Sequence, residues 1–215
     1  MPKVIQVNQS VYAVNDAIAD EVRAKNQEHH TVMLNVMASP GAGKTTLLLK
    51  TLDALKGEYR IGVMEADIES SVDADIIEAA GVRAIQVHTG GECAMDAEMT
   101  LQAIEEFHTE NLDLLILENV GNLVCPAETD TGADKKVVLL SVPEGDDKPL
   151  KYPLMFEVAD IVLITKIDTK PYFTFNEQAV IDNIRLRNKH AEILFVSAKK
   201  GDGMDRWLEW LKALL

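Results

Sequence analysis

The sequence is short of basic residues and of long apolar runs, and each shortage excludes a class of protein. Against 35 Asp and Glu there are only 21 Lys and Arg, so the formal charge is −14 at pH 7 and repels nucleic acids and anionic membranes. No apolar run approaches the roughly 20 residues that a membrane-spanning helix needs, and Met1-Pro2-Lys3 begins no signal peptide. We therefore expect a cytoplasmic protein with no nucleic-acid or membrane partner.

Cysteine is also scarce, since Cys93 and Cys125 are the only two in 215 residues. A disulfide between them is possible in principle, but a cytoplasmic compartment keeps thiols reduced. Metal binding and simple burial are the better interpretations. The remaining composition, 47% hydrophobic and 26% charged, is that of a globular protein large enough for one α/β domain.

The most informative stretch is VMLNVMASPGAGKTTLLL, residues 32–49, where an apolar strand leads through a small-residue loop into a helix. Gly41 and Gly43 allow backbone N–H groups to converge on phosphate oxygens. Lys44 would reach the β- and γ-phosphates, and the Thr45 hydroxyl would ligate Mg²⁺. Ala38 stands where the strict pattern has Gly, a small departure. The predicted phosphate-binding residues are Pro40, Gly41, Ala42, Gly43, Lys44, Thr45 and Thr46.

Apolar strands alternating with helical patterns predict a three-layer α/β fold of the P-loop NTPase type, with a mostly parallel sheet covered by helices on both faces. Further strands are expected at 60–66, 82–88, 112–118, 137–142, 161–165 and 193–196, and helices at 72–80, 94–107, 176–188 and 204–215. An amphipathic leader helix, within 1–30, is expected to pack on a single domain formed by 31–215. The polar loop at 143–151 is predicted to be either functional or merely solvated.

Ligands of an open parallel sheet collect beyond the carboxyl ends of its strands. Asp67 and Glu118 occupy such positions and, with Thr45, are candidates to hold Mg²⁺; two plain exposed carboxylates are the alternative. Gly121 can offer a backbone N–H to the γ-phosphate. The predicted catalytic set is thus Lys44, Asp67, Glu118 and Gly121. Asn122 stands where Ras-type enzymes have Gln, so we expect slow hydrolysis.

The base is predicted from Thr165-Lys166-Ile167-Asp168, a variant of the Asn-Lys-x-Asp element of GTPases. The Asp168 carboxylate can accept two hydrogen bonds from the guanine edge, which adenine lacks, while the Lys166 stem covers the base. Ser197-Ala198-Lys199 resembles the Ser-Ala-Lys element that supports the same base. The combination favours GTP and GDP over adenine nucleotides.

Both cysteines fall on the same predicted edge. Cys93 lies at the start of the helix expected at 94–107, whose positive end would favour the thiolate, and Cys125 lies on the loop that follows Glu118. Their joint position favours a metal site for Ni²⁺ or Zn²⁺ over two buried thiols.

Together these motifs resemble HypB, the hydrogenase nickel-incorporation GTPase, over nearly the whole chain. The resemblance rests on the phosphate loop, Glu65-Ala66-Asp67, Gly90-Gly91-Glu92-Cys93, Met95-Asp96-Ala97, Glu118-Asn119-Val120-Gly121-Asn122-Leu123-Val124-Cys125-Pro126 and Gly145-Asp146-Asp147-Lys148-Pro149-Leu150-Lys151-Tyr152-Pro153. It implies a GTP-dependent metallochaperone of the SIMIBI class, related to UreG. Such a protein dimerises with nucleotide, works with HypA and delivers Ni²⁺ to the [NiFe]-hydrogenase large subunit.

The sequence departs from the family where Ala94 replaces a usual His, so metal handling must rest on Cys93 and Cys125. Two thiolates cannot fill a four-coordinate site. A dimer would bring four sulfurs together, and His88, Glu92 or solvent could supplement them. Lys148 and Lys151 are candidates to contact the other subunit or a phosphate.

Three other functions stay open. One is a GTPase chaperone for urease nickel or cobalamin, although Pro126-Ala127 lacks the Cys-Pro-His of UreG. Another is a metal-storing dimer with incidental GTP turnover. The third, a small-molecule kinase, is disfavoured by Asp168.

Overall fold

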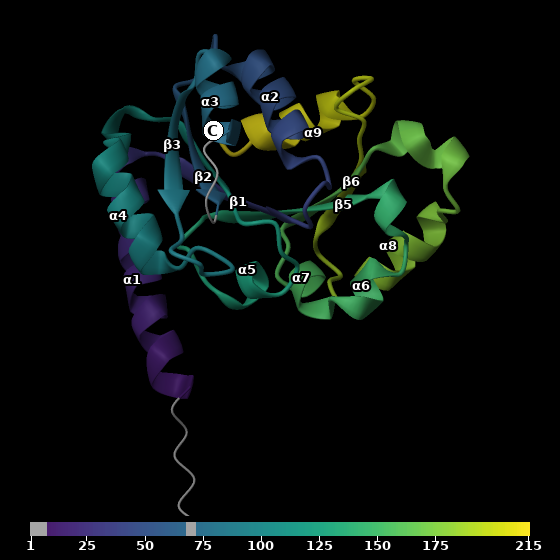
Figure 1. Cartoon of the computed structure of the whole chain (residues 1–215), viewed down its shortest axis with the longest axis horizontal. Helices are drawn as coiled ribbons and strands as arrows, with labels where there is room; N and C mark the ends of the chain where they lie inside the picture. The colour runs from purple at the N-terminus through teal and green to yellow at the C-terminus, as the bar shows by residue number, and fades with distance from the viewer. Residues whose placement is uncertain (1–7, 68–71) are drawn as a thin grey trace, which may run out of the picture.

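The computed structural model describes residues 8–67 and 72–215, which form one parallel sheet of seven strands between helical layers (Figure 1). The strand order is β3-β2-β4-β1-β5-β6-β7, and every neighbouring pair is parallel. The strands are β1 (Val32–Ala38), β2 (Ile61–Asp67), β3 (Arg83–His88), β4 (Leu114–Glu118), β5 (Lys135–Ser141), β6 (Ile161–Thr165) and β7 (Glu192–Phe195). The predicted α/β fold is confirmed, and the sheet is parallel throughout rather than mostly parallel.

The helices divide between the two faces of this sheet. Helices α2 (Lys44–Leu55), α3 (Val72–Ala79) and α9 (Met204–Lys212) share one apolar core with the strands. The opposite face is covered by α1 (Asn8–His29), α4 (Ala97–Phe107), α5 (Cys125–Glu128), α7 (Pro153–Glu157) and α8 (Glu177–Arg185). Shorter elements are η1 (Thr109–Asn111), η2 (Val142–Glu144), α6 (Lys148–Lys151) and η3 (Ile167–Tyr172). None of the helices in the described part of the chain is both long and apolar enough to cross a bilayer.

The side chains of strand β1 are buried on both faces of the sheet. Its side chains alternate, so Leu34 and Val36 pack in the core beneath α2, while Met33 and Met37 pack on the other face. All four are at most 1% exposed. A strand buried on both sides reads as a continuous apolar run, and β1 lies fourth of seven in the sheet.

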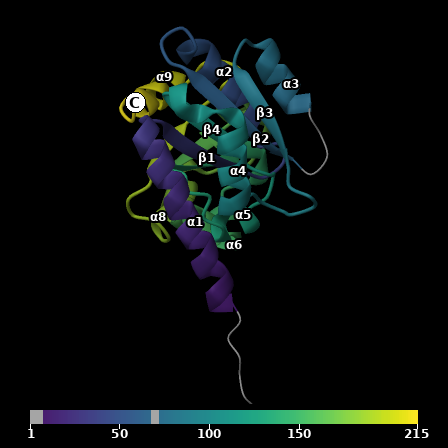
Figure 2. The same ribbon diagram turned by 90° about the vertical axis from the view of Figure 1, so that its left-hand side faces the viewer.

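The leader helix α1 runs alongside α4, as Figure 2 shows. Arg23 donates to both carboxylate oxygens of Asp130 at 3.2 and 3.1 Å, and Asn15 Oδ1 accepts a hydrogen bond from the backbone N–H of Ala97 at 3.0 Å. Polar contacts therefore fix α1 on the domain in addition to the buried Val22. Residues 1–7 of the segment expected to carry this helix lie outside the described residues.

Two predicted segments differ from the structure for local reasons. The helix expected from residue 94 begins at Ala97, because the Asp96 side chain caps it by accepting from Met99 N at 2.8 Å. The polar loop expected at 143–151 is ordered into η2 and α6, with Glu144 accepting from both the backbone N–H and the hydroxyl of Ser141.

Candidate functional site

The phosphate loop connects β1 to α2. Gly41 and Gly43 have φ values of +76° and +101°, a left-handed conformation that glycine adopts without strain. Gly43 caps α2, so Lys44 is the first residue of the helix and lies at its positive end. Ala38 is the last residue of β1 and is fully buried beneath α2, which explains why a small side chain occupies that position.

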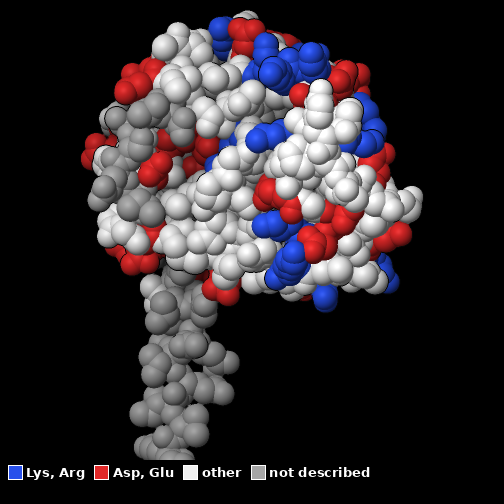
Figure 3. Space-filling model, turned by 45° about the vertical axis from the view of Figure 1, so that its right-hand side comes forward, with Lys and Arg blue, Asp and Glu red and all other residues white. Residues whose placement is uncertain are grey.

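Beside this loop lies a cavity of about 560 Å³ at the carboxyl ends of the strands. Most of the predicted phosphate and magnesium residues line it: Pro40, Gly41, Gly43, Lys44, Thr45, Thr46, Asp67, Glu118 and Gly121. Lys166, predicted to cover the base, lines it as well. Ala42 is buried and does not line the cavity. Although the whole chain is acidic, its basic side chains gather locally in patches on the face drawn in Figure 3.

Glu118 connects the phosphate loop to the sheet. Its Oε1 accepts a hydrogen bond from Thr45 Oγ1 at 3.4 Å and lies 3.9 Å from Lys44 Nζ. Glu118 is only 4% exposed, so it is a buried carboxylate facing a lysine and not the exposed acid that the alternative required. Oxygen donors from Thr45, Asp67 and Glu118 in one cavity are the donor set that Mg²⁺ prefers.

Sequence analysis named Glu65 only as part of a motif and assigned it no role at the site. This residue lies in β2 in register with Glu118 of β4, is 3% exposed and lines the same cavity. On its other side it is in register with Gln86 of β3, which also lines the cavity. An acid inside an otherwise apolar buried strand, two residues before Asp67 and therefore on the same face, was the available clue.

A second cavity of about 270 Å³ adjoins the first, sharing Gly43, Thr46 and Lys166 with it. It brings together most of the predicted base-binding residues: Thr165, Lys166, Asp168, Ala198 and Lys199. Ser197 is fully buried behind it, and its hydroxyl donates to Asp168 Oδ1 at 2.7 Å. This bond fixes the carboxylate that was predicted to accept hydrogen bonds from guanine.

The base loop is tied directly to the phosphate loop. Thr165 Oγ1 donates to the Ala42 carbonyl at 2.7 Å, and Lys166 Nζ donates to the Gly41 carbonyl at 2.6 Å. Thr165 lacks the side-chain amide of the usual Asn, but its hydroxyl joins the base loop to the phosphate loop.

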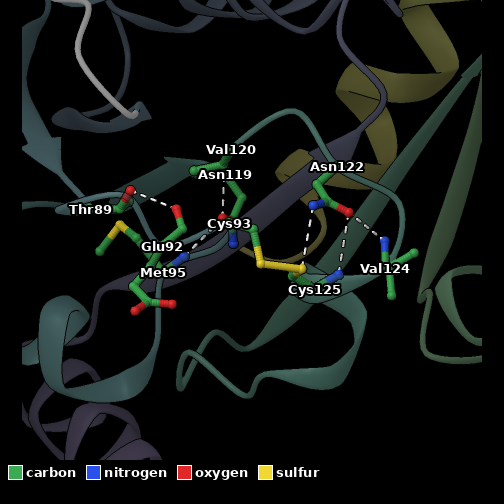
Figure 4. Close-up of a disulfide and its surroundings, with 9 residues drawn as sticks. All are labelled: Thr89, Glu92, Cys93, Met95, Asn119, Val120, Asn122, Val124 and Cys125. Carbon is green, nitrogen blue, oxygen red and sulfur yellow. Dashed lines mark hydrogen bonds between the residues drawn. A yellow bond between two sulfur atoms is a disulfide. The ribbon is translucent and has the colours of Figure 1, made fainter.

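The sulfurs of Cys93 and Cys125 are bonded to each other as a disulfide, with 6.0 Å between the Cα atoms (Figure 4). This corrects the expectation of two reduced thiols. Burial does not explain the cysteines either, because Cys93 is exposed and Cys125 is partly exposed. Sequence had placed both on one edge, and the structure places their sulfurs in contact within one chain.

The local setting of the pair also differs from expectation. Cys93 lies before the capped start of α4, so that helix does not begin at its thiol; Cys125 instead is the first residue of the short α5. Asn122 Oδ1 accepts from the backbone N–H groups of Val124 and Cys125 at 2.7 and 3.3 Å, and its Nδ2 lies 3.4 Å from Cys125 Sγ (Figure 4).

The supplementary ligands considered for the pair do not gather around it. Within residues 8–67 and 72–215, no three His, Cys, Asp or Glu side chains are grouped so as to hold a metal ion. His88 and Glu92 are both exposed.

On the polar segment at 143–151, Lys151 forms an ion pair with Asp147 at 2.6 Å, which lowers the pKa of that carboxyl. Lys148 lies over the Tyr152 ring.

Comparison with known proteins gives consistent matches. The model of the CobW/HypB/UreG nucleotide-binding domain matches residues 32–195. The hydrogenase maturation factor HypB of Azotobacter chroococcum mcd 1 is 44% identical over 210 residues, 98% of this chain and 69% of that protein. The hydrogenase/urease maturation factor HypB of Helicobacter hepaticus is 39% identical over 214 residues, with 98% and 88% covered.

Solved structures agree with these matches. The crystal structure of HypB from Helicobacter pylori in complex with nickel has a TM-score of 0.87 and 39% identity, covering 93% of this chain and 94% of that chain. HypB from Archaeoglobus fulgidus has a TM-score of 0.88 and 35% identity, with 94% and 98% covered. The chain therefore belongs to the HypB hydrogenase maturation factors, within the CobW/HypB/UreG family of nucleotide-binding domains.

Proposed function

We propose that this protein is a GTP-hydrolysing nickel metallochaperone for [NiFe]-hydrogenase maturation. Residues 31–215 form the GTPase domain, on which the helix within 1–30 packs. Cys93 and Cys125 hold the metal, Ni²⁺ or Zn²⁺. The observation that carries the proposal is that the two sulfurs meet on the segments that follow β3 and β4. The segment after β4 begins directly after Glu118, which contacts the phosphate loop.

The nucleotide end of the mechanism follows from the two adjoining cavities. The phosphate loop and Lys44 hold the phosphates, and Asp168, fixed by Ser197, accepts hydrogen bonds from guanine. Thr45, Asp67 and Glu118 would hold Mg²⁺, which neutralises charge on the phosphates. Gly121 presents its backbone to the same cavity.

Slow intrinsic hydrolysis is also supported by contacts. Asn122, where Ras-type enzymes have the glutamine that orients water, has its side chain turned to Val124 and Cys125. The Asn122 side chain stabilises the turn that carries Cys125 and does not orient a water molecule.

The metal end requires the reduced pair, because a disulfide has no thiolate to offer. Two thiolates from each of two subunits complete a four-sulfur site, which suits Zn²⁺ and accepts Ni²⁺. GTP favours the homodimer that brings the pairs together, and hydrolysis weakens it. A HypA-like protein and the hydrogenase large subunit are the partners. The crystal structure of the Helicobacter pylori relative is a complex with nickel, which supports Ni²⁺ as the cargo of this chain.

The test uses reduced protein and separates nucleotide from metal. Ni²⁺ affinity and dimer fraction are measured with GDP and with a non-hydrolysable GTP analogue, by chelator competition and light scattering. We expect both to rise with the analogue in the wild type, and both Cys93→Ser and Cys125→Ser to lose Ni²⁺ binding while keeping nucleotide. Equal Ni²⁺ affinity and equal dimer fraction in the two nucleotide states would refute the proposal.

A second client, urease, is favoured by the name of one relative described above, the hydrogenase/urease maturation factor of Helicobacter hepaticus. Deletion of the gene followed by separate urease and hydrogenase assays distinguishes the two clients.

A further inference from the structure

Two consecutive residues at the end of β4 contact the nucleotide site and the loop that carries Cys93. Glu118 faces the phosphate loop, accepting from Thr45 Oγ1 at 3.4 Å. The side chain of Asn119, a residue that also lines the phosphate cavity, points to the opposite face of the sheet, and its Oδ1 accepts a hydrogen bond from the backbone N–H of Met95 at 3.2 Å. Met95 lies two residues after Cys93, so this bond reaches the loop that carries one of the two sulfurs (Figure 4). The two contacts lie on opposite faces because neighbouring residues of an extended chain point in opposite directions.

Asn119 is held rigidly. Its side chain is 1% exposed; Nδ2 donates to Asn35 Oδ1 at 3.1 Å, and Oδ1 also accepts from Val120 N at 2.9 Å. Its backbone N–H donates to the Val36 carbonyl at 3.0 Å, which attaches it to β1, the strand that leads into the phosphate loop. A buried amide with this many partners has one stable orientation, so a shift of its backbone is passed on to Met95.

The loop that carries Cys93 is held by a buried residue, Met95, which bonds to Asn119. Met95 is fully buried in the core beneath α4, whereas Cys93 is exposed. The exposed cysteine thus takes its position from the buried residue that Asn119 holds. Cys125, in contrast, follows the loop through Gly121 and Asn122, so the two sulfurs are positioned by two separate connections from the end of β4.

We infer that Asn119 is the positioning residue that transmits occupancy of the nucleotide site to the cysteine pair. This inference rests on the proposed function and names how its two sites communicate. A change in the contacts of Glu118 moves the adjacent residue, and Asn119 carries that movement to Met95 and hence to Cys93, altering the fit of the two thiolates around a metal ion.

The test compares reduced wild type with Asn119→Ala. Ni²⁺ affinity is measured by chelator competition in the presence of GDP and of a non-hydrolysable GTP analogue, and the ratio of the two affinities is the readout. We expect a wild-type ratio of roughly 5 or more, as is typical of coupled sites, and a ratio below about 2 in the variant. Asn26→Ala is the matched control, because Asn26 is equally buried, at 1% exposed, but lies on α1 beside Met33. Its ratio should equal that of the wild type.

The outcomes separate this inference from the function on which it rests. If the wild type has the same affinity in both nucleotide states, the proposed coupling fails and this inference fails with it. If the wild-type ratio is present and Asn119→Ala keeps it, only the role of Asn119 is refuted. Should Asn119→Ala not fold, hydrogen exchange of the Met95 amide in the wild type decides. Its protection must differ between GDP and the analogue, and identical protection overturns the inference.

Discussion

Gly121 lies directly against Pro40, so that a methyl group on its α-carbon would come within 2.9 Å of Pro40 Cγ and 3.1 Å of Pro40 N. The loop after β4 therefore packs on the phosphate loop without room for a side chain. This close approach joins the phosphate loop directly to the segment that leads to Cys125.

Gly121→Ala should push these two loops apart. Overpacking of this kind costs about 1–3 kcal/mol, so we expect the affinity for a GTP analogue to fall by roughly 10-fold, and the affinity for GDP to fall less. Titration with fluorescent nucleotides measures both. Gly57→Ala is the control, because a methyl group there meets no atom within 4 Å. Equal losses for both nucleotides would show that Gly121 does not sense the γ-phosphate.

Lys44→Ala should weaken GTP and GDP alike. Lys44 lies at the positive end of α2 in the phosphate cavity, and a charge-assisted hydrogen bond to phosphate contributes about 1.5–3 kcal/mol. We expect a loss of roughly 10- to 100-fold in calorimetric titrations. Lys50→Ala, on the exposed side of the same helix, should bind as the wild type does. Unchanged binding by the Lys44 variant would remove this residue from the site.

Asp168→Asn should change which base is bound. The carboxylate that accepts from Ser197 Oγ would become a carboxamide, which cannot accept two hydrogen bonds from guanine but can donate one to the 2-oxo group of xanthine. We expect GDP affinity to fall about 10-fold or more, and xanthosine diphosphate to bind better than GDP. A variant that still prefers GDP would mean that another group reads the base.

Ni²⁺ binding should require reduction of the protein. Thiol titration under denaturing conditions should find no free thiol before reduction and two after it, since the chain has two cysteines and both are in the disulfide. Ni²⁺ binding, measured after removal of the reductant under nitrogen, should appear only in the second sample. Equal binding by the oxidised protein would place the metal elsewhere.

Thr51→Val should destabilise the packing of α9 on α2. Trp207 Nε1 donates to Thr51 Oγ1 at 2.8 Å, and both side chains are at most 1% exposed. Valine keeps the shape but leaves a buried N–H without its partner, which costs about 1–3 kcal/mol of unfolding free energy. Urea denaturation measures it. Thr46→Val is not a suitable control, because Thr46 lines the nucleotide cavities. Lys50→Ala, at an exposed position of the same helix, is the control, and we expect no change in its free energy of unfolding.

The sequence predicted well wherever local pattern decides structure. The apolar run of β1, the glycines after it and Lys44 fix a strand, a loop and a helix start within one short stretch, and parallel strands then place Asp67, Glu118 and Asp168 on one edge. The ends of the expected strands lie within two residues of the observed ones, and those of the strand at 161–165 are the same.

What the sequence could not provide depends on contacts between distant segments. No pattern indicates that Cys93 and Cys125 share a bond, since that depends on how two loops from neighbouring strands are held. The link from Thr165 to Ala42 is of the same kind. Glu65 is a different case, because its place in a buried strand was readable but its neighbours were not.

The alternation at the end of β4 has a consequence for the length of that strand. One residue added to β4, or removed from it, would turn the carboxylate now beside Thr45 toward α4 and bring the amide beneath the phosphate loop. Loops on either side can vary in length without this exchange. The spacing between the strand's first residue, Leu114, and its last is therefore constrained by the contacts of Glu118 and Asn119 as well as by the apolar core.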